Sequence, residues 1–360
     1  MSAENQRRRD PSVAPLRLVA WETTRACNLR CVHCRAQAAD RPLPGELSTE
    51  EGLALIDEIA SFGPVVLILT GGEPLLRSDI VELARGGSEA GLRVVMAPNG
   101  TLLTPERARQ LVAAGVKRVS ISLDGATAEV HDAFRGMPGA YAGALNGMES
   151  ARSAGLPFQI NTTVTKKNLG ELDAIFRLAR ERGAVGVHVF LLVPTGRGAD
   201  IEETQITPAE YERTLGWIEE KSRELPIEIK TTCAPPYNRV FVQRVRRREG
   251  DEAARRALTE SRSIGCMGGQ QFAFVSSTGT LSPCGYLELD CGSVHREGFR
   301  EAWLHNPIFA ALRRREDYHG KCGVCEYRDV CGGCRARAYA ATGDYLAEEP
   351  CCVYRPAACH

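Results

Sequence analysis

Short apolar runs alternate with longer amphipathic runs from Leu16 to about Lys230. The short runs are rich in β-branched residues, as buried strands are, and the longer runs repeat their apolar residues with a helical period. Strands are therefore expected at residues 16–21, 65–70, 93–97, 118–123, 158–164 and 185–193. Strands that alternate with helices favour a parallel sheet, so the pattern predicts an α/β fold with a partial (β/α)6 barrel of the TIM-like type.

The alternation ends near Lys230, and this change sets the expected domain boundaries. The barrel is expected over 16–235, a highly charged helical linker over 236–265, and a cysteine-rich domain over 266–360. Residues 1–15 are expected to be disordered. A chain of 360 residues, 43% of them hydrophobic, is long enough to bury the cores of one large and one smaller domain.

Charge, hydropathy and cysteine content narrow the function. Lys+Arg and Asp+Glu both number 45, so the net charge gives no reason to expect a nucleic acid partner. The sequence contains no run of eighteen apolar residues, so no membrane span is expected. Fourteen cysteines occur in two groups, 27–34 and 266–359, with Cys233 between them. Closely spaced cysteines without an export signal favour metal or cluster binding over disulfides, so a cytoplasmic protein with reduced thiols is expected.

The first group, Cys27, Cys31 and Cys34, follows the first expected strand with the spacing C-x3-C-x2-C. A [4Fe-4S] cluster normally takes four thiolates, so three cysteines with no fourth nearby leave one iron free to bind a reactant. A closed zinc site is the alternative and needs a fourth ligand. His33 is the nearest candidate, but it lies between two of the cysteines and cannot readily join them around one ion.

With Asn28-Leu29 after its first cysteine, this loop resembles the cluster motif of the radical S-adenosylmethionine (SAM) enzymes. The resemblance implies a cluster whose free iron binds SAM and whose electron cleaves it to a 5′-deoxyadenosyl radical. It also implies a set of SAM contacts, which are His33, Gly71, Gly72, Glu73, Ser122, Asp124, Arg135, Asn161 and Leu192.

Several of these contacts have an ordinary alternative. Gly71-Gly72 is also a common turn sequence. Arg135 could simply be an exposed arginine before a loop glycine, and Leu192 could simply pack in the core. Ser122 and Asp124 are separated by two positions on one expected strand, so they share a face that the barrel can turn toward its lumen.

Cysteines of the second group have three ordered spacings. Cys266, Gly279 and Cys284 have the spacing C-x12-G-x4-C. A block of four cysteines with the spacing C-x2-C-x5-C-x2-C follows, and a pair of adjacent cysteines comes last. The block and the pair are Cys322, Cys325, Cys331, Cys334, Cys351 and Cys352. Taken alone, the block also fits a zinc ribbon. The order of these three spacings resembles the SPASM extension of radical SAM enzymes, which implies two auxiliary [4Fe-4S] clusters.

The SPASM resemblance also implies a ligand set for each auxiliary cluster. One set is Cys266, Cys284 and Cys334, and the other is Cys322, Cys325 and Cys331 with either Cys351 or Cys352. The fourth ligand of the first set is Cys291, Cys233 or an open iron. The spacing between Cys331 and Cys334 departs from the usual x3, and Cys359 is not expected to be a ligand.

Residues 18–22, 191–198, 232–235, 284–291 and 322–327 resemble the haem-forming radical SAM enzymes of the sirohaem-dependent haem pathway. This resemblance implies that two propionates of iron-coproporphyrin III become the vinyl groups of haem b. The reaction needs cations that bind carboxylates, for which the candidates are Arg197, Lys230 and Arg239. It also needs a reductant or redox protein and an electron acceptor.

Three other functions stay open. A related tetrapyrrole enzyme, such as a didecarboxysirohaem deacetylase or a haem d1 maturase, shares nearly all of these motifs. A peptide-modifying SPASM enzyme usually carries a peptide-binding domain at its N-terminus, for which residues 1–15 are too short. If the protein only transferred electrons, the glycine-rich loop at Gly71-Gly72, which resembles a SAM-binding loop, would have no ligand.

Overall fold

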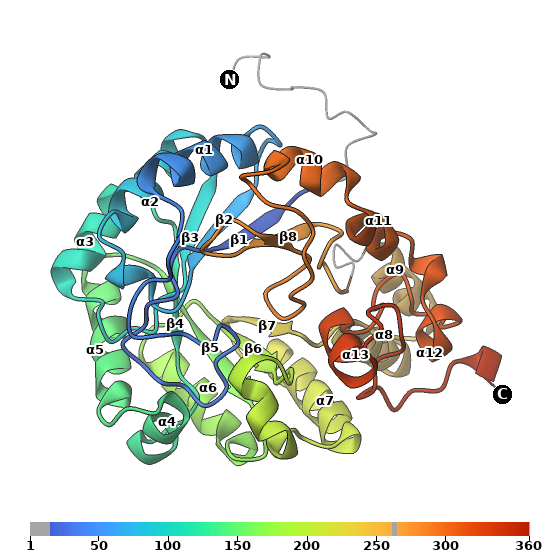
Figure 1. Ribbon diagram of the computed structural model, residues 1–360. Helices are drawn as coiled ribbons and strands as arrows, with labels where there is room; N and C mark the ends of the chain where they lie inside the picture. Colours follow the sequence, from blue (N-terminus) through green and yellow to red (C-terminus); the bar gives the residue numbers. More distant parts are fainter. Residues whose placement is uncertain (1–14, 261–264, 360) are drawn as a thin grey trace, which may run out of the picture.

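The computed structural model describes residues 15–260 and 265–359 (Figure 1). Within these residues a single sheet has nine strands in the order β7-β6-β5-β4-β3-β2-β1-β8-β9. All neighbours pair in parallel except β8 and β9. The strands are β1 (Leu18–Glu22), β2 (Val66–Thr70), β3 (Arg93–Met96), β4 (Val119–Ser122), β5 (Phe158–Val164), β6 (Gly186–Leu191), β7 (Glu228–Thr232), β8 (Phe272–Val275) and β9 (Leu281–Ser282). Residues 1–14 of the segment predicted to be disordered lie outside the described residues.

The α/β barrel is confirmed, and all six expected strands are present as β1 to β6. The sheet is nevertheless larger than the six strands predicted. β7 was missed because it carries polar residues and its side chains are only partly buried. β8 was missed because it belongs to the cysteine-rich region, yet it pairs with β1 from Leu18↔Phe272 to Trp21↔Val275. A strand from late in the chain therefore extends the barrel sheet beyond β1.

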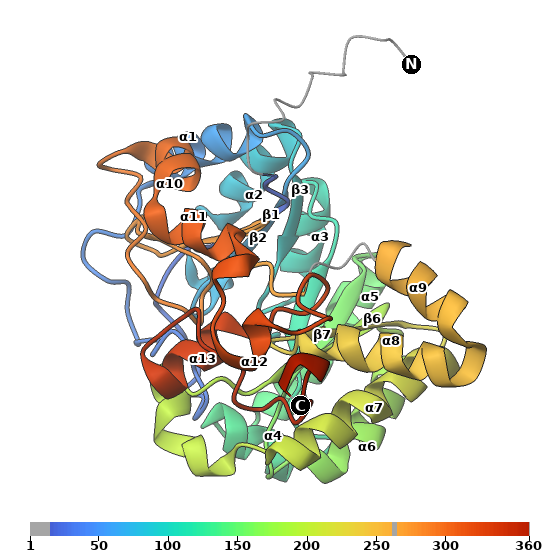
Figure 2. The ribbon, with the colours of Figure 1, turned by 90° about the vertical axis from the view of Figure 1, so that its right-hand side faces the viewer.

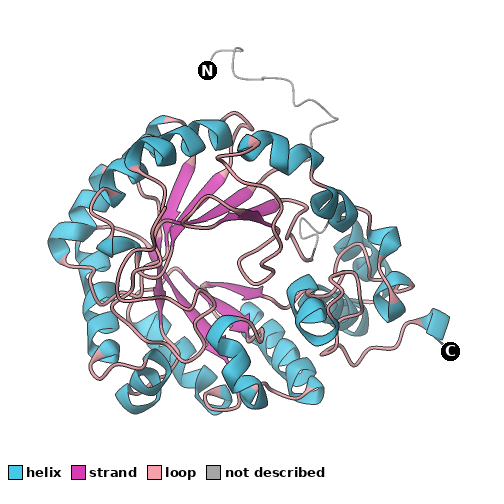
Figure 3. Ribbon diagram, viewed as in Figure 1, coloured by secondary structure: helices cyan, strands magenta, loops and turns pink. Residues whose placement is uncertain are grey.

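Helices cover the outside of the curved sheet (Figure 3). Those of the barrel region and the segment after it are α1 (Thr49–Ala60), α2 (Ile80–Glu89), α3 (Pro105–Ala113), α4 (Ala128–Arg135), α5 (Ala140–Ser153), α6 (Leu172–Glu181), α7 (Pro208–Glu224), α8 (Pro236–Glu249) and α9 (Asp251–Glu260). Later come α10 (Gly298–His305), α11 (Pro307–Arg313), α12 (Gly320–Gly323) and α13 (Arg335–Thr342). Local signals begin several of them: Ser48 forms a capping box with Glu51, and Thr207 forms one with Glu210.

The two faces of the sheet differ in polarity. Ile121, Ile160 and Val187 on neighbouring strands point into the main hydrophobic core beneath the helices. The register on the opposite face pairs Ser122 with Asn161, Asn161 with His188, and His188 with Lys230. Because side chains alternate between faces along a strand, these polar residues form one row across β4 to β7 on the lumen side.

The cysteine-rich region packs beside the open side of the barrel. Figure 2 shows α12 and α13 next to α8. Asn238 Nδ2 on α8 donates to Val330 O (2.8 Å), and Val242 of the same helix packs in a small core with Tyr327 and Cys331. Helix α8 therefore packs against the C-terminal segment that contains Cys331.

Candidate functional site

The first three cysteines lie in a loop between β1 and α1. Cys27 N donates to Ala39 O (2.7 Å), which joins the two ends of the loop. Backbone N–H groups also donate to sulfur, from Leu29 to Cys27 (3.4 Å) and from Ala38 to Cys34 (3.5 Å). Burial raises the pKa of the Cys27 thiol to about 12, so this thiol keeps its proton unless a metal replaces it. The three thiols interact electrostatically with one another, so the fold brings these sequence-predicted ligands together.

The glycine-rich loop after β2 packs directly on the cysteine loop. Gly72 N donates to Thr24 O and Glu73 N donates to Ala26 O, both at 2.7 Å. A Cβ atom at Gly72 would lie 2.3 Å from Ala26 O, and one at Gly71 would lie 2.5 Å from Thr24 O. The two glycines are therefore needed for close contact between two backbone segments, a requirement that the sequence did not reveal.

Glu73 is fully buried and links three loops. Its carboxylate accepts Leu75 N (3.0 Å) and Asn99 N (2.6 Å). The Asn99 side chain in turn donates to Asn28 Oδ1 (2.8 Å) in the cysteine loop. Burial raises the pKa of Glu73 to about 7. These two hydrogen bonds of the Glu73 carboxylate hold the loop after β2 against the loop after β3.

Asp124 lies just beyond β4, is fully buried, and contacts one arginine and one histidine. Arg135 Nη2 lies 2.6 Å from Asp124 Oδ2, and His33 Nε2 lies 3.4 Å from the same oxygen. Arg135 Nη1 also donates to Cys31 Sγ (3.7 Å). The positive charge of Arg135 opposes the effect of burial and holds the pKa of Asp124 below its usual value. Arg135 therefore connects a cysteine ligand candidate to a buried carboxylate.

Several buried polar atoms around the cysteine loop have no protein partner among the described residues. They are His33 Nδ1, Arg135 Nε and Arg197 Nη2. Burial lowers the pKa of His33 to about 4, so its ring is neutral near pH 7. Buried polar groups normally have a partner, so unpartnered atoms around a three-cysteine loop fit a polar cofactor bound there.

Residues of the lumen row include three of the sequence candidates, Ser122, Asn161 and Lys230. Asn161 Oδ1 accepts from Gln159 Nε2 (3.1 Å), which also lies 2.9 Å from His188 Nδ1. Burial lowers the pKa of His188 to about 4. Lys230 pairs with Glu228 on its own strand (2.6 Å), and its side chain is 55% exposed. The ammonium group of Lys230 is thus a cation accessible from this face of the sheet.

Arg197 and Arg239 are engaged at two different places. Arg197 Nε and Nη1 donate to Cys31 O (2.9 Å) and Ala38 O (3.1 Å), so this residue supports the cysteine loop. Arg239 is 2% exposed and binds the Glu212 carboxylate, with Nη1 2.8 Å from Oε1. Arg239 also lines a pocket formed by auxiliary cysteines. The structure does not bring these two arginines together.

Four cysteines from distant segments of the chain meet beside the end of β6. Cys266 interacts electrostatically with Cys334, Cys284 interacts with both, and Cys233 interacts with Cys334 and Cys284. Cys233, Cys284 and Cys334 also pack in one apolar cluster with Val193. The structure therefore groups the three cysteines assigned to one auxiliary set and adds Cys233.

The remaining set lines one pocket, which contains Cys322, Cys325, Cys331 and Cys352. Backbone N–H groups two residues further along the chain favour the thiolate form of Cys325, Cys331 and Cys352, against the effect of burial, which raises the pKa of all three thiols. In residues 15–260 and 265–359, no three His, Cys, Asp or Glu side chains converge on a single-ion position. Thiolates of a cubane cluster bind different irons and need not converge in that way.

Three cysteines lie outside these groups. Cys291 is fully buried in the main hydrophobic core, where its N–H donates to Leu281 O (2.9 Å). Cys351 N donates to Glu349 Oε1 (3.1 Å), its thiol interacts electrostatically with Cys334 and Cys352, and its side chain does not line the four-cysteine pocket. Cys359 is exposed in the short segment Ala357–Cys359.

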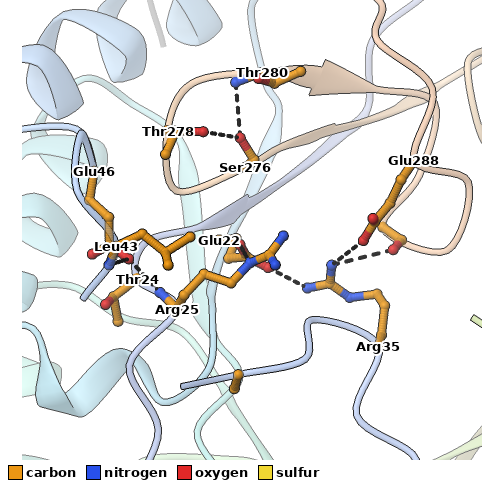
Figure 4. A network of polar contacts seen from close by, with 12 residues as sticks. Glu22, Thr24, Arg25, Arg35, Leu43, Glu46, Ser276, Thr278, Thr280 and Glu288 are labelled. Carbon is orange, nitrogen blue, oxygen red and sulfur yellow. Dashed lines mark hydrogen bonds and ion pairs between the residues drawn. The ribbon is translucent and has the colours of Figure 1, made fainter. Parts of the chain in front are cut away.

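A charged network that no sequence pattern indicated joins the cysteine loop to the auxiliary region (Figure 4). Glu22 at the end of β1 is fully buried, and its carboxylate oxygens lie 2.6 Å from Arg25 Nε and 3.0 Å from Arg35 Nη2. Arg35 Nη1 donates to Gly285 O (3.3 Å) and lies 3.9 Å from Glu288. Arg35, which follows Cys34, therefore contacts Gly285, which follows Cys284.

Comparisons with known proteins agree with this geometry. Residues 21–179 match the radical SAM superfamily, and residues 266–327 match an iron-sulfur cluster-binding domain, SPASM. The AdoMet-dependent heme synthase of Methanosarcina barkeri is 54% identical over 94% of this chain and 97% of its own length. That of Nitratidesulfovibrio vulgaris is 49% identical, over 94% and 93%. The Fe-coproporphyrin III synthase of Methanosarcina barkeri is 35% identical, over 93% and 87%.

Solved structures share the fold. SuiB of Streptococcus suis bound to precursor peptide SuiA has a TM-score of 0.75 at 16% identity, over 95% of this chain and 77% of its own. Native anSMEcpe with bound AdoMet has a TM-score of 0.69 at 19% identity, over 92% and 94%. No helix among the described residues is both long and apolar enough to cross a membrane. The matches imply [4Fe-4S] chemistry and SAM, and the chain belongs to the radical SAM superfamily, in the SPASM-containing group that includes the AdoMet-dependent heme synthases.

Proposed function

We propose that this enzyme converts two propionate side chains of iron-coproporphyrin III to vinyl groups and so forms haem b. The observation that carries the proposal is the 54% identity to an AdoMet-dependent heme synthase over nearly the full length of both chains. That identity is well above the 35% identity to an Fe-coproporphyrin III synthase, which makes haem synthesis the preferred assignment among tetrapyrrole reactions.

Cys27, Cys31 and Cys34 are the proposed ligands of the radical SAM cluster. Bound there, the cluster and SAM supply the hydrogen-abstracting radical typical of the superfamily. Glu73 and the two glycines before it hold the loops that frame this position, through the short backbone contacts to Thr24 and Ala26. The unpartnered nitrogens of His33 and Arg135 are proposed to face bound SAM.

Two residue sets are proposed to hold two auxiliary clusters. The four-cysteine pocket holds one, with Cys352 in place of Cys351 as its fourth ligand because Cys352 lines the pocket. The set of Cys266, Cys284 and Cys334 holds the other. Backbone N–H donors to the sulfurs fit this role, since such hydrogen bonds stabilise thiolates that bind iron. These oxygen-sensitive sites suit a reducing cytoplasm.

Each propionate must lose one hydrogen atom, one carbon dioxide and one electron to become a vinyl group. Cys27, Cys31 and Cys34 would hold the cluster that supplies a radical able to accept the hydrogen atom, and the two auxiliary cysteine sets would hold clusters that supply a path for the electron toward an external acceptor. Two turnovers per haem therefore consume two SAM and release two carbon dioxide. An external reductant or redox protein is also needed to start each turnover.

Residues of this chain must also hold the carboxylates. Lys230 is the proposed lumen anchor because its ammonium is accessible and lies in the row with Ser122 and Asn161. Arg197 is proposed as a second anchor through its unpartnered Nη2. Arg239 already binds Glu212, and this pairing favours a role at the auxiliary pocket.

Anaerobic incubation with SAM, a reductant and iron-coproporphyrin III tests the proposal. Mass spectrometry is expected to show stepwise loss of two carboxyl groups, through a monovinyl species, to haem b. Parallel reactions with didecarboxysirohaem and with a haem d1 precursor separate the related tetrapyrrole activities. SAM cleavage without any monovinyl or haem product would overturn the haem-synthase assignment and leave the superfamily assignment intact.

A further inference from the structure

The auxiliary set of Cys266, Cys284 and Cys334 supplies only three thiolates, one fewer than a [4Fe-4S] cluster normally takes. We propose that Cys233 is the fourth ligand of this auxiliary cluster, so that no iron of the cluster is open to substrate. This inference rests on the proposed auxiliary clusters, because it concerns the ligand set of one of them. Cys233 lies between the barrel and α8, 33 residues before Cys266 in the sequence.

Thiol contacts give the first argument. Cys233 interacts electrostatically with both Cys334 and Cys284. All three side chains pack in the same apolar cluster beside Val193. A cysteine in that position shares the immediate surroundings of two proposed ligands. Four thiolates around one site satisfy the usual coordination of a [4Fe-4S] cluster.

Backbone geometry gives a second, independent argument. Cys233 has φ +58°, and only one other non-glycine residue among those described, Gln37, has a positive φ. A non-glycine residue in this region is strained, and such strain is concentrated at functional sites. The conformation is held by two buried donors to the Cys233 carbonyl, Arg337 Nη1 at 3.0 Å and the Tyr211 hydroxyl at 3.5 Å.

Cys291 does not fit the same position. It is fully buried in the main core, its backbone pairs with Leu281, and the charge of its neighbour Asp290 acts on its thiol. The alternative of Cys291 as the fourth ligand is therefore disfavoured by its place in the fold. A cluster closed by Cys233 can accept an electron but cannot bind a propionate, so carboxylate binding must depend on side chains.

Cyanide labelled with ¹³C tests this directly, because it binds an open iron but not one with four thiolates. The anaerobic holoenzyme is saturated with a SAM analogue that the reduced cluster cannot cleave, so that the radical cluster stays occupied, and is then reduced and measured by electron-nuclear double resonance. Wild-type protein is expected to show no ¹³C coupling at the auxiliary clusters. Cys233→Ala is expected either to bind about one cyanide per chain there or to lose about four irons per chain. The matched control Cys291→Ala is expected to behave as wild type.

The proposal is overturned if wild-type auxiliary clusters bind cyanide, or if Cys291→Ala gains the coupling while Cys233→Ala does not. Circular dichroism checks that each variant is folded. The wild-type measurement tests, without any variant, whether an iron is open, and a folded Cys233→Ala variant that behaves as wild type also overturns the proposal. Failure of the haem-synthase assignment is distinguishable, since it appears as an absence of product from a wild-type enzyme whose clusters are intact.

Discussion

The guanidinium of Arg337 lies against the carboxylate of Glu349, with Nη1 3.2 Å from Oε2, and the two residues are only 2% and 0% exposed. Arg337 Nη2 also donates to the carbonyls of Leu191 and Leu192 at the end of β6. Glu349 Oε2 accepts Cys334 N (2.7 Å). One buried ion pair therefore joins the barrel sheet to an auxiliary cysteine.

Replacing Arg337 by methionine should strongly destabilise the protein. The substitution leaves the Glu349 carboxylate buried without its cation, a change that typically costs about 3–5 kcal/mol. Anaerobic denaturant unfolding measures the loss. Arg109→Met is the control, because Arg109 pairs with Glu106 at the surface and both side chains are more than 60% exposed. The control should change stability by less than about 1 kcal/mol, and equal effects of the two variants would contradict the role given to the buried pair.

Gly72→Ala should disturb the cysteine loop without direct contact to a thiol. A Cβ there would lie 2.3 Å from Ala26 O, and backbone atoms cannot yield as a flexible side chain can. The expected cost is about 1–3 kcal/mol, as for other overpacked sites, with reduced iron content after reconstitution. Gly170→Ala is the matched control because nothing lies within 4 Å of its Cβ position. Iron retention equal to the control would show that the two loops separate easily.

Local patterns explain which features were predictable. The first six strands are apolar runs of neighbouring residues, and the spacing of Cys27, Cys31 and Cys34 is confined to one loop, so the sequence displays both. Pairing of β1 with β8 joins residues about 250 positions apart and leaves no local pattern. Strand β7 was hidden for another reason, since its partly exposed side chains do not form an apolar run.

Buried charge was the least predictable feature of the site. Glu22 ends an apolar strand, and nothing local shows that its carboxylate holds both Arg25 and Arg35. The position of Cys233 was equally hidden, because its thiol partner Cys334 is 101 residues away. Such partners are set by the folded topology, so sequence spacing alone left Cys233, Cys291 and an open iron as the possibilities.

Lys230→Gln should weaken binding of iron-coproporphyrin III while leaving SAM cleavage intact. Loss of one hydrogen bond to a charged group costs about 1.5–3 kcal/mol, so KM should rise about tenfold to a hundredfold. Steady-state assays of haem formation, with 5′-deoxyadenosine measured in parallel, check both quantities. Lys167→Gln, at an exposed position outside the lumen row, should leave KM unchanged. An unchanged KM for the Lys230 variant would remove this lysine from the proposed anchors.

His131 should make stability fall as the solution becomes acidic. Its Nδ1 accepts the N–H of Asp124 (3.0 Å), which requires a neutral ring. Burial, with a further contribution from Arg135, lowers the pKa of His131 from 6.5 to about 4. The unfolded chain therefore binds the proton more readily. The stabilising contribution of this histidine is complete above pH 6.5 and decreases as the pH falls toward 4.

Between pH 8 and pH 6 this effect should remove about 1 kcal/mol of stability, since the unfolded histidine becomes largely protonated over that range while the folded one stays neutral. His131→Asn keeps an acceptor for Asp124 N but does not titrate, so its stability should change less over the same range. Anaerobic urea unfolding of both proteins at the two pH values gives the difference. Parallel pH profiles for wild type and variant would mean that the folded protein protonates His131 as readily as the unfolded chain does, and that the loop after β4 tolerates both the charge and the loss of the bond to Asp124.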